Sequence, residues 1–117
     1  MRSLLEEERS VEVVGEARDG REALSLCESL LPDLAILDIA MPQLNGIEVA
    51  SQALKQNPRL RVIMLSMYAH ESYIIRALMA GARGYLLKEV AEEDLLPAVR
   101  AVSQGRSYFS PAISSSC

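Results

Sequence analysis

The chain has 117 residues, a formal net charge of −4, and hydrophobic residues at half of its positions. This length predicts one domain with a single buried core. No apolar run approaches the roughly 18 residues that a membrane span needs. Acidic and basic residues are mixed along the chain, so no basic stripe points to nucleic acid. The start lacks an apolar signal core and a cleavage site, so we expect a cytoplasmic protein that contacts neither membrane nor nucleic acid.

The first part of the chain predicts a helix, a strand and a second helix. Residues 3–8 are typical of the last turns of a helix, and the β-branched, alternating residues 11–17 predict a strand near a sheet edge. The next helix begins after Asp19, which caps it while Glu22 reaches back as in a capping box. Its expected apolar stripe is Ala23, Cys27, Leu30 and Leu31. Cys27 is therefore expected as a small buried hydrophobe, and with Cys117 it gives no disulfide or metal pattern.

A run of apolar residues at 34–38 ends on Asp38 and is followed at once by a Pro/Asn/Gly-rich turn. Such a run predicts a strand that is covered on both faces, as in a parallel sheet. Asp38 then lies at the carboxyl end of a buried strand, where open α/β sheets bind their ligands. The alternative is that Asp38 only caps the turn that follows.

The rest of the chain repeats helix and buried strand. Helices are predicted at 46–56, 71–80 and 92–104, and strands at 61–66 and 84–87. Pro97 predicts a kink in the last helix or a late start. The residues expected to face the core are Ile47, Ala50, Ala53, Leu54, Ile74, Ala77, Leu78, Gly81, Leu95, Leu96, Val99 and Val102, with Met64, Met67 and Met79 as core filler. The single histidine, His70, is expected in a solvated loop.

Alternating strands and helices with short connections predict parallel strands and right-handed crossovers. Three predicted strands end at Asp38, Ser66 and Lys88, so a carboxylate, a hydroxyl and an ammonium are expected at one edge of the sheet. This set suits phosphoryl transfer to a carboxylate. Asp38 would be the nucleophile, Ser66 would hydrogen-bond a phosphoryl oxygen, and Lys88 would pair with both carboxylate and phosphoryl group.

These residues and their surroundings resemble the receiver domain of bacterial two-component response regulators, in particular the NarL/FixJ subfamily. The motifs that carry the resemblance are Val13-Val14-Gly15-Glu16-Ala17 with Asp19-Gly20, Leu37-Asp38 with Met41-Pro42 and Asn45-Gly46, Ile63-Met64-Leu65-Ser66, and Gly81-Ala82-Arg83-Gly84-Tyr85-Leu86-Leu87-Lys88. The resemblance implies a flavodoxin-like (CheY-like) three-layer α/β fold with a parallel sheet of about four strands here. It implies a receiver domain over residues 1–111, a frayed tail or linker start at 112–117, and no effector domain.

The resemblance also implies a role for each site residue. Asp38 would be the phosphoacceptor for a histidine kinase, Ser66 the switch hydroxyl, Tyr85 the rotameric aromatic and Lys88 the fixed lysine. Asp38 and the backbone carbonyl of Ala40 would bind Mg²⁺. From the residues alone, an aromatic at Tyr85 is also explained by simple packing.

The sequence departs from the family pattern at its start. The family's first strand, central in its sheet, ends in an acidic pair that holds the metal, and no such pair follows an apolar run near the start of this chain. Asp19 and Glu89 are better explained as a helix cap and a turn residue. We therefore expect weak Mg²⁺ binding. The strands expected at 11–17 and 34–38 would pair directly, or be bridged by a second copy, or leave the chain marginally stable as a fragment.

Two functions follow from these expectations. The first is a phosphorylated receiver whose helix 71–80, strand at Tyr85 and last helix form a partner or homodimer surface. The alternative is a phosphorylation-deficient receiver fragment that serves as an interaction or dimerisation module. An enzyme is not expected beyond weak autophosphatase activity, because an aspartyl phosphatase would carry a second Asp at Ala40. A flavin protein would need a phosphate-binding loop after its first strand, which is not found.

Overall fold

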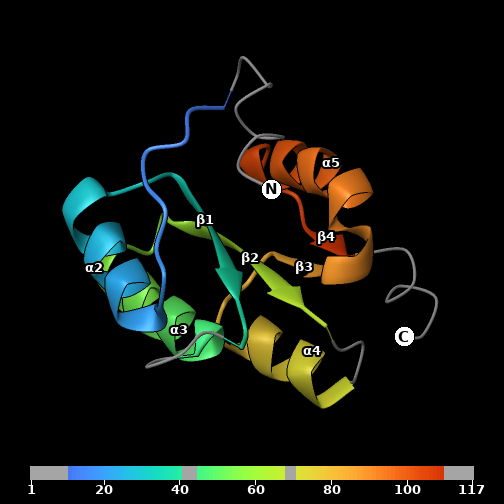
Figure 1. The fold of residues 1–117 in the computed structure, drawn as a ribbon, viewed down its shortest axis with the longest axis horizontal. Helices are drawn as coiled ribbons and strands as arrows, with labels where there is room; N and C mark the ends of the chain where they lie inside the picture. Colours follow the sequence, from blue (N-terminus) through green and yellow to red (C-terminus); the bar gives the residue numbers. More distant parts are fainter. Residues whose placement is uncertain (1–10, 41–44, 68–70, 110–117) are drawn as a thin grey trace.

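The computed structural model describes residues 11–40, 45–67 and 71–109. They form three layers with a parallel sheet in the middle (Figure 1). The strands, in sheet order, are β1 (Leu34–Asp38), β2 (Arg61–Ser66), β3 (Gly84–Leu87) and β4 (Tyr108–Phe109). The helices are α2 (Gly20–Leu30), α3 (Gly46–Gln56), α4 (Glu71–Met79), the short 3₁₀ helix η1 (Lys88–Val90) and α5 (Ala91–Ser103). The predicted α/β fold class is confirmed, and the predicted boundaries of α3, β1, β2 and β3 match the structure.

Helices cover both faces of the sheet, which explains the unbroken apolar strands. Helices α2, α3 and α4 lie on one face and α5 on the other (Figure 1). Along β2, Val62 and Met64 pack toward the first group, whereas Ile63 and Leu65 pack toward α5. Alternating side chains therefore enter two different cores, and a strand of this kind has no polar face.

The strand predicted at residues 11–17 is wrong: this segment is extended coil without a sheet partner. Val11 packs with Leu34 and Ile36 on the α5 side, whereas Ala17 packs on the opposite core. The segment therefore crosses the free edge of β1 instead of running along it, so alternation alone did not make a strand. Of the outcomes expected, direct pairing of this segment with β1 does not occur.

The fourth strand of the sheet is β4, which the sequence did not predict. It has only two residues and pairs in parallel with β3, with Gly84 opposite Tyr108 and Tyr85 opposite Phe109. The sheet thus has about the predicted number of strands, but its fourth strand is β4 and not the segment 11–17. In the described part of the chain, β1 forms one edge of the sheet and β4 forms the other.

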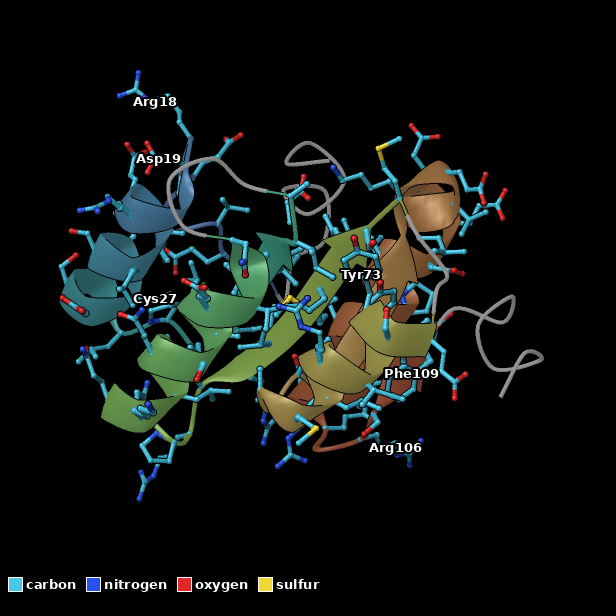
Figure 2. All side chains as sticks on the ribbon, turned by 90° about the horizontal axis from the view of Figure 1, so that it is seen from below. Arg18, Asp19, Cys27, Tyr73, Arg106 and Phe109 are labelled. Carbon is cyan, nitrogen blue, oxygen red and sulfur yellow. The ribbon has the colours of Figure 1, made fainter. Side chains whose placement is uncertain are left out.

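Helix α2 begins with the predicted cap (Figure 2). The Asp19 carboxylate accepts a hydrogen bond from the Glu22 N–H at 2.9 Å. The Glu22 side chain reaches back, accepting from the N–H of Arg18 at 3.3 Å, and its other oxygen lies 3.7 Å from the Arg18 Nε. The reciprocal bonds of a capping box are present, with the return bond one residue further out than in the usual pattern.

Several apolar residues expected in the core are exposed. Met67 is 72% exposed and Met79 is 84% exposed, whereas Met64 is fully buried. The others are Leu30, Leu31 and Leu78. Met67 follows the end of β2, and α4 turns only Ile74 and Ala77 fully inward, so Leu78 and Met79 lie on its outer side.

The end of α2 and the start of α5 account for two further differences from the predictions. Leu31 ends α2 in the left-handed region, with φ 48°, beyond the packed part of the helix. Helix α5 begins at Ala91 with Pro97 inside it, so a late start caused by the proline is wrong. Cys27 is buried as predicted, between α2 and α3 (Figure 2).

The predictions for residues 3–8, Met41-Pro42, His70, Cys117 and the tail 112–117 lie outside the described residues. Among the helices described, none is long and apolar enough to cross a membrane.

Candidate functional site

The parallel topology brings three predicted site residues to the carboxyl edge of the sheet. Asp38 ends β1, Ser66 ends β2, and Lys88 follows β3 directly. The Lys88 ammonium forms an ion pair with Oδ2 of Asp38. The two side chains are 34% and 33% exposed, so the pair is open to solvent but not fully solvated. The contact expected between Asp38 and Lys88 is therefore present.

The second oxygen of Asp38 is used by the turn that follows β1. Its Oδ1 accepts a hydrogen bond from the Ala40 N–H at 2.9 Å. The next residue, Ile39, donates its N–H to the Leu65 carbonyl at 3.0 Å, which extends the pairing with β2. The turn-capping role considered for Asp38 is thus real, but it does not explain the ion pair with Lys88. Among the described residues each carboxylate oxygen has one partner, and together these partners fix the direction of the group.

Helix α3 approaches the backbone of Asp38 at Gly46. A Cβ atom at this position would lie 2.5 Å from the Asp38 carbonyl oxygen and 2.9 Å from its carbonyl carbon. The Gly46 N–H donates to the Ile39 carbonyl at 3.2 Å, and Asn45 caps the helix by accepting from the Glu48 N–H at 3.0 Å. The sequence placed Asn45-Gly46 in a turn, but nothing in it indicated this close approach to the site.

Ser66 and Tyr85 form a buried polar pair behind the ion pair. Ser66 is 2% exposed and Tyr85 is 1% exposed. Burial raises the pKa of the Tyr85 phenol, a side-chain hydrogen bond with Ser66 acts to lower it, and nearby Tyr73 adds to the rise. Tyr85 is thus packed, as the simpler explanation held, and also hydrogen-bonded to the hydroxyl that the switch role names.

The described residues do not by themselves fit a Mg²⁺ site. Within residues 11–40, 45–67 and 71–109 no group of three or more His, Cys, Asp or Glu side chains is placed to hold a metal ion. Asp38 supplies one carboxylate, which is already paired with Lys88, and Ala40 adds at most a carbonyl. Asp19 caps α2, and Glu89 lies within η1. Mg²⁺ demands near-ideal octahedral oxygen geometry and dehydrates reluctantly.

Among the described residues, Asp38 lies apart from the hollows of the structure. The two hollows identified in the described part lie at the ends of α2 and α3, away from the carboxyl edge of the strands, and the larger has a volume of about 320 Å³. They are lined by residues such as Leu31, Gln56 and Asn57, and neither is lined by Asp38 or Lys88. The Asp38 carboxylate, a third exposed, is accessible from solvent at this edge of the sheet.

Comparison with known proteins identifies the family. The family model described as response regulator receiver domain matches residues 1–100. The chain is 38% identical to the transcriptional regulatory protein DegU of Brevibacillus brevis over 113 residues, which are 97% of this chain and 48% of that protein. It is 37% identical to the response regulator protein VraR of Staphylococcus aureus over 111 residues, 95% of this chain and 53% of that protein. The chain thus spans about half the length of these curated relatives.

Solved structures agree with this match. A LuxR-family two-component response regulator from Aurantimonas sp. SI85-9A1 superposes with a TM-score of 0.92 at 31% identity, covering 97% of this chain and 81% of that one. The signal receiver domain of NarL from Mycobacterium tuberculosis gives a TM-score of 0.83 at 38% identity, covering 90% of this chain and 85% of that one. By sequence and by fold, the chain belongs to the response regulator receiver domain family of two-component systems, alongside NarL- and LuxR-type regulators.

Proposed function

We propose that Asp38 of this receiver domain is phosphorylated by a histidine kinase. Receiver domains accept phosphoryl groups and are generally not enzymes, and they generally bind Mg²⁺ at an acidic site. For this chain, the observation that carries the assignment is the ion pair of Asp38 with Lys88 at the carboxyl edge of the sheet. About a third of each of the two side chains is exposed. An ammonium fixed beside a carboxylate that is to become an acyl phosphate has the charge that phosphoryl transfer needs.

The chemistry uses the partners already in place. A carboxylate oxygen of Asp38 attacks the phosphorus of a phosphohistidine, and the P–N bond breaks. Its electron pair stays on the imidazole, which takes up a proton, and an acyl phosphate forms on Asp38. The Lys88 ammonium stays next to the growing negative charge. The bond from the Ala40 N–H keeps the carboxylate directed out of the sheet edge. Any autophosphatase activity would be hydrolysis of this acyl phosphate, in which water takes the phosphoryl group as inorganic phosphate and the Asp38 carboxylate is regenerated, and it would be weak.

Ser66 and Tyr85 are proposed to respond to the new group. The phosphoryl oxygens compete for the Ser66 hydroxyl, which in this structure is hydrogen-bonded to Tyr85. The response is proposed to reach the surface of α4, β4 and α5, because β3, which the sequence placed in this surface, is buried and covered at its edge by β4. Helix α4 adds exposed apolar side chains there, namely Ile75, Leu78 and Met79. A protein partner or a second copy of the chain is the proposed occupant, in the cytoplasm, with no direct contact to DNA or membrane.

The domain assignment follows the same argument. We assign residues 1–111 to the receiver domain and residues 112–117 to the beginning of a linker. The family model covers residues 1–100, and β4 extends the folded part to Phe109. We assign to these residues no activity of the part of the longer relatives that this chain does not cover.

A second candidate function has its own observation. The described residues offer no group of three acidic or other metal-binding side chains, so the chain also fits a phosphorylation-deficient receiver that acts as an interaction or dimerisation module. Within the described residues, the edge of β1 that has no strand partner adds a surface for such contacts.

One experiment separates the two candidates. The chain is incubated with acetyl phosphate and Mg²⁺, and its intact mass is measured. A gain of one phosphoryl group in the wild type and in Asp33→Asn, but not in Asp38→Asn, supports the phosphoacceptor. Asp33 is the matched control because it is an exposed carboxylate just before the other end of β1. No gain in the folded wild type supports the second candidate.

A further inference from the structure

Strand β4 closes the sheet edge at β3 with one aromatic side chain on each face. Tyr108 packs on the core beneath α5, and Phe109 packs on the opposite core, which includes Tyr85. The Tyr108 N–H donates to the Arg83 carbonyl at 2.9 Å, and its hydroxyl donates to Oδ1 of Asp94 in α5 at 3.3 Å. A strand this short is held mainly by these side chains, because its backbone offers few ladder bonds.

The connection from α5 to β4 is a defined turn. Gly105 has φ 85° and its N–H donates to the Val102 carbonyl at 3.0 Å, while the Arg106 N–H donates to the Ala101 carbonyl at 2.9 Å. These two bonds form a Schellman motif, which stops the helix and reverses the chain. Arg61 of β2 also donates to the last carbonyls of α5. The chain therefore enters β4 from a fixed point, and the aromatic contacts decide whether β4 stays docked.

Phe109 lies next to the buried switch pair. In the register of β3 and β4 it is opposite Tyr85, and both side chains belong to the core on the α4 side. Tyr73 of α4 packs on the same core (Figure 2). A half-buried Phe109 thus covers the flank of a Tyr85 side chain that is 1% exposed and hydrogen-bonded to Ser66.

We propose that Tyr85 and β4 form one two-state unit, in which β4 stays docked only while Tyr85 is buried against Ser66. A change at Ser66 is then passed through Tyr85 and Phe109 to the backbone that follows residue 109. The coupling itself is a property of the unmodified chain. It rests on the proposed function only for what moves Ser66, namely the phosphoryl group on Asp38.

The physical basis is mutual cover. When Tyr85 leaves its buried position, Phe109 loses a neighbour in a well-packed core. The backbone bonds of a two-residue strand are few and hold it only weakly, so β4 then undocks more often. When β4 leaves, the flank of Tyr85 is opened to water. Coupling between two such elements is reciprocal: undocking of β4 favours exposure of Tyr85 by the same factor as exposure of Tyr85 favours undocking of β4.

Two reporters read the two halves of the unit in the intact chain. Hydrogen exchange of the Tyr108 amide reports β4 docking, because that N–H is bonded to Arg83. The ionisation of Tyr85, followed by NMR of labelled tyrosine rings, reports its burial. Phe109→Ala is expected to bring the Tyr85 pKa down toward its ordinary value. Tyr85→Phe, which removes only the hydroxyl, is expected to speed Tyr108 exchange by about tenfold.

Tyr108→Phe tests the same strand from its other face. It removes the bond to Asp94 that helps to hold β4, so it is expected to shift the Tyr85 pKa in the same direction as Phe109→Ala, by a smaller amount. If Phe109→Ala leaves the Tyr85 pKa as in the wild type, or Tyr85→Phe leaves Tyr108 exchange unchanged, the coupling does not exist. Should Phe109→Ala fail to fold, Phe109→Leu is used, with the same expected direction.

The last experiment tests whether phosphorylation of Asp38 acts on β4 through Tyr85. After acetyl phosphate treatment, mass spectrometry gives the modified fraction, and Tyr108 exchange is compared at equal modification in the wild type and Tyr85→Phe. A change in the wild type that is lost in the variant supports the link to the site. Modified wild type with unchanged exchange overturns that link. No modification at all counts against the proposed function, and the two substitutions then still decide the coupling.

Discussion

Replacing Gly46 with alanine is expected to destabilise the protein even though alanine is the better helix former. The helix-propensity gain is at most about 1 kcal/mol, because that value applies to a helix interior and Gly46 is the first residue of α3. Against it, the new Cβ would lie 2.5 Å from the Asp38 carbonyl oxygen, and its neighbours are backbone atoms rather than a flexible side chain. Overpacking of a core costs about 1–3 kcal/mol, and the fixed backbone here places the cost at the upper end. The net loss is therefore roughly 2 kcal/mol.

Urea unfolding followed by circular dichroism measures this loss, and acetyl phosphate labelling measures its effect on Asp38. Gly105→Ala is the matched control, because a Cβ there meets nothing within 4 Å but the backbone has φ 85°. It should cost roughly 1 kcal/mol through its left-handed conformation and leave labelling unchanged. A Gly46→Ala protein as stable as the wild type and labelled at the same rate would refute the argument that α3 is positioned by the missing side chain.

Three further predictions concern the site and the core. Asp38→Asn should abolish the acyl phosphate, whereas Ser66→Ala should keep it but lose its effect on the NMR spectrum; equal labelling of the Asn variant would contradict the assignment. A Mg²⁺ titration should show weak binding, and tight binding that depends on Asp38 would show that the acidic site is complete. Burial, and to a lesser degree Glu28, raise the pKa of the Cys27 thiol, so the folded state keeps a proton that the unfolded chain loses. The free energy of unfolding should therefore fall as the pH rises above about 8.5, and it should fall less in Cys27→Ala. If the urea midpoint of the wild type falls with pH no more than that of Cys27→Ala, this reasoning is wrong.

The parts of the fold that could be predicted depend on local pattern plus parallel topology. The run that ends at Ser66 is buried on both faces and the run that ends at Asp38 is partly buried on both, so composition alone indicated their strands. Once the strands are parallel, their carboxyl ends must share an edge, and the pair of Asp38 with Lys88 follows.

The rest depends on neighbours that a sequence does not name. Residues 11–17 alternate like a strand, but a strand needs a pairing partner, and the described chain gives this segment none. Strand β4 is too short to show any period. Met67 and Met79 are as apolar as Met64, and only the helix and strand positions decide which of them is covered. The approach of Gly46 to Asp38 required atomic positions.

The free edge of β1 has a consequence for how the site fluctuates. The Asp33 carbonyl and the Ile39 N–H both bond to β2, so the backbone groups of the alternate residues Leu34, Ile36 and Asp38 face the free edge. In the described chain, the carboxylate to be phosphorylated is thus carried by a strand paired on one side only. Edge strands open at a lower local free energy than strands paired on both sides. Opening of β1 would then move Asp38 relative to Lys88, so a segment that pairs with this edge would steady the site without touching the carboxylate.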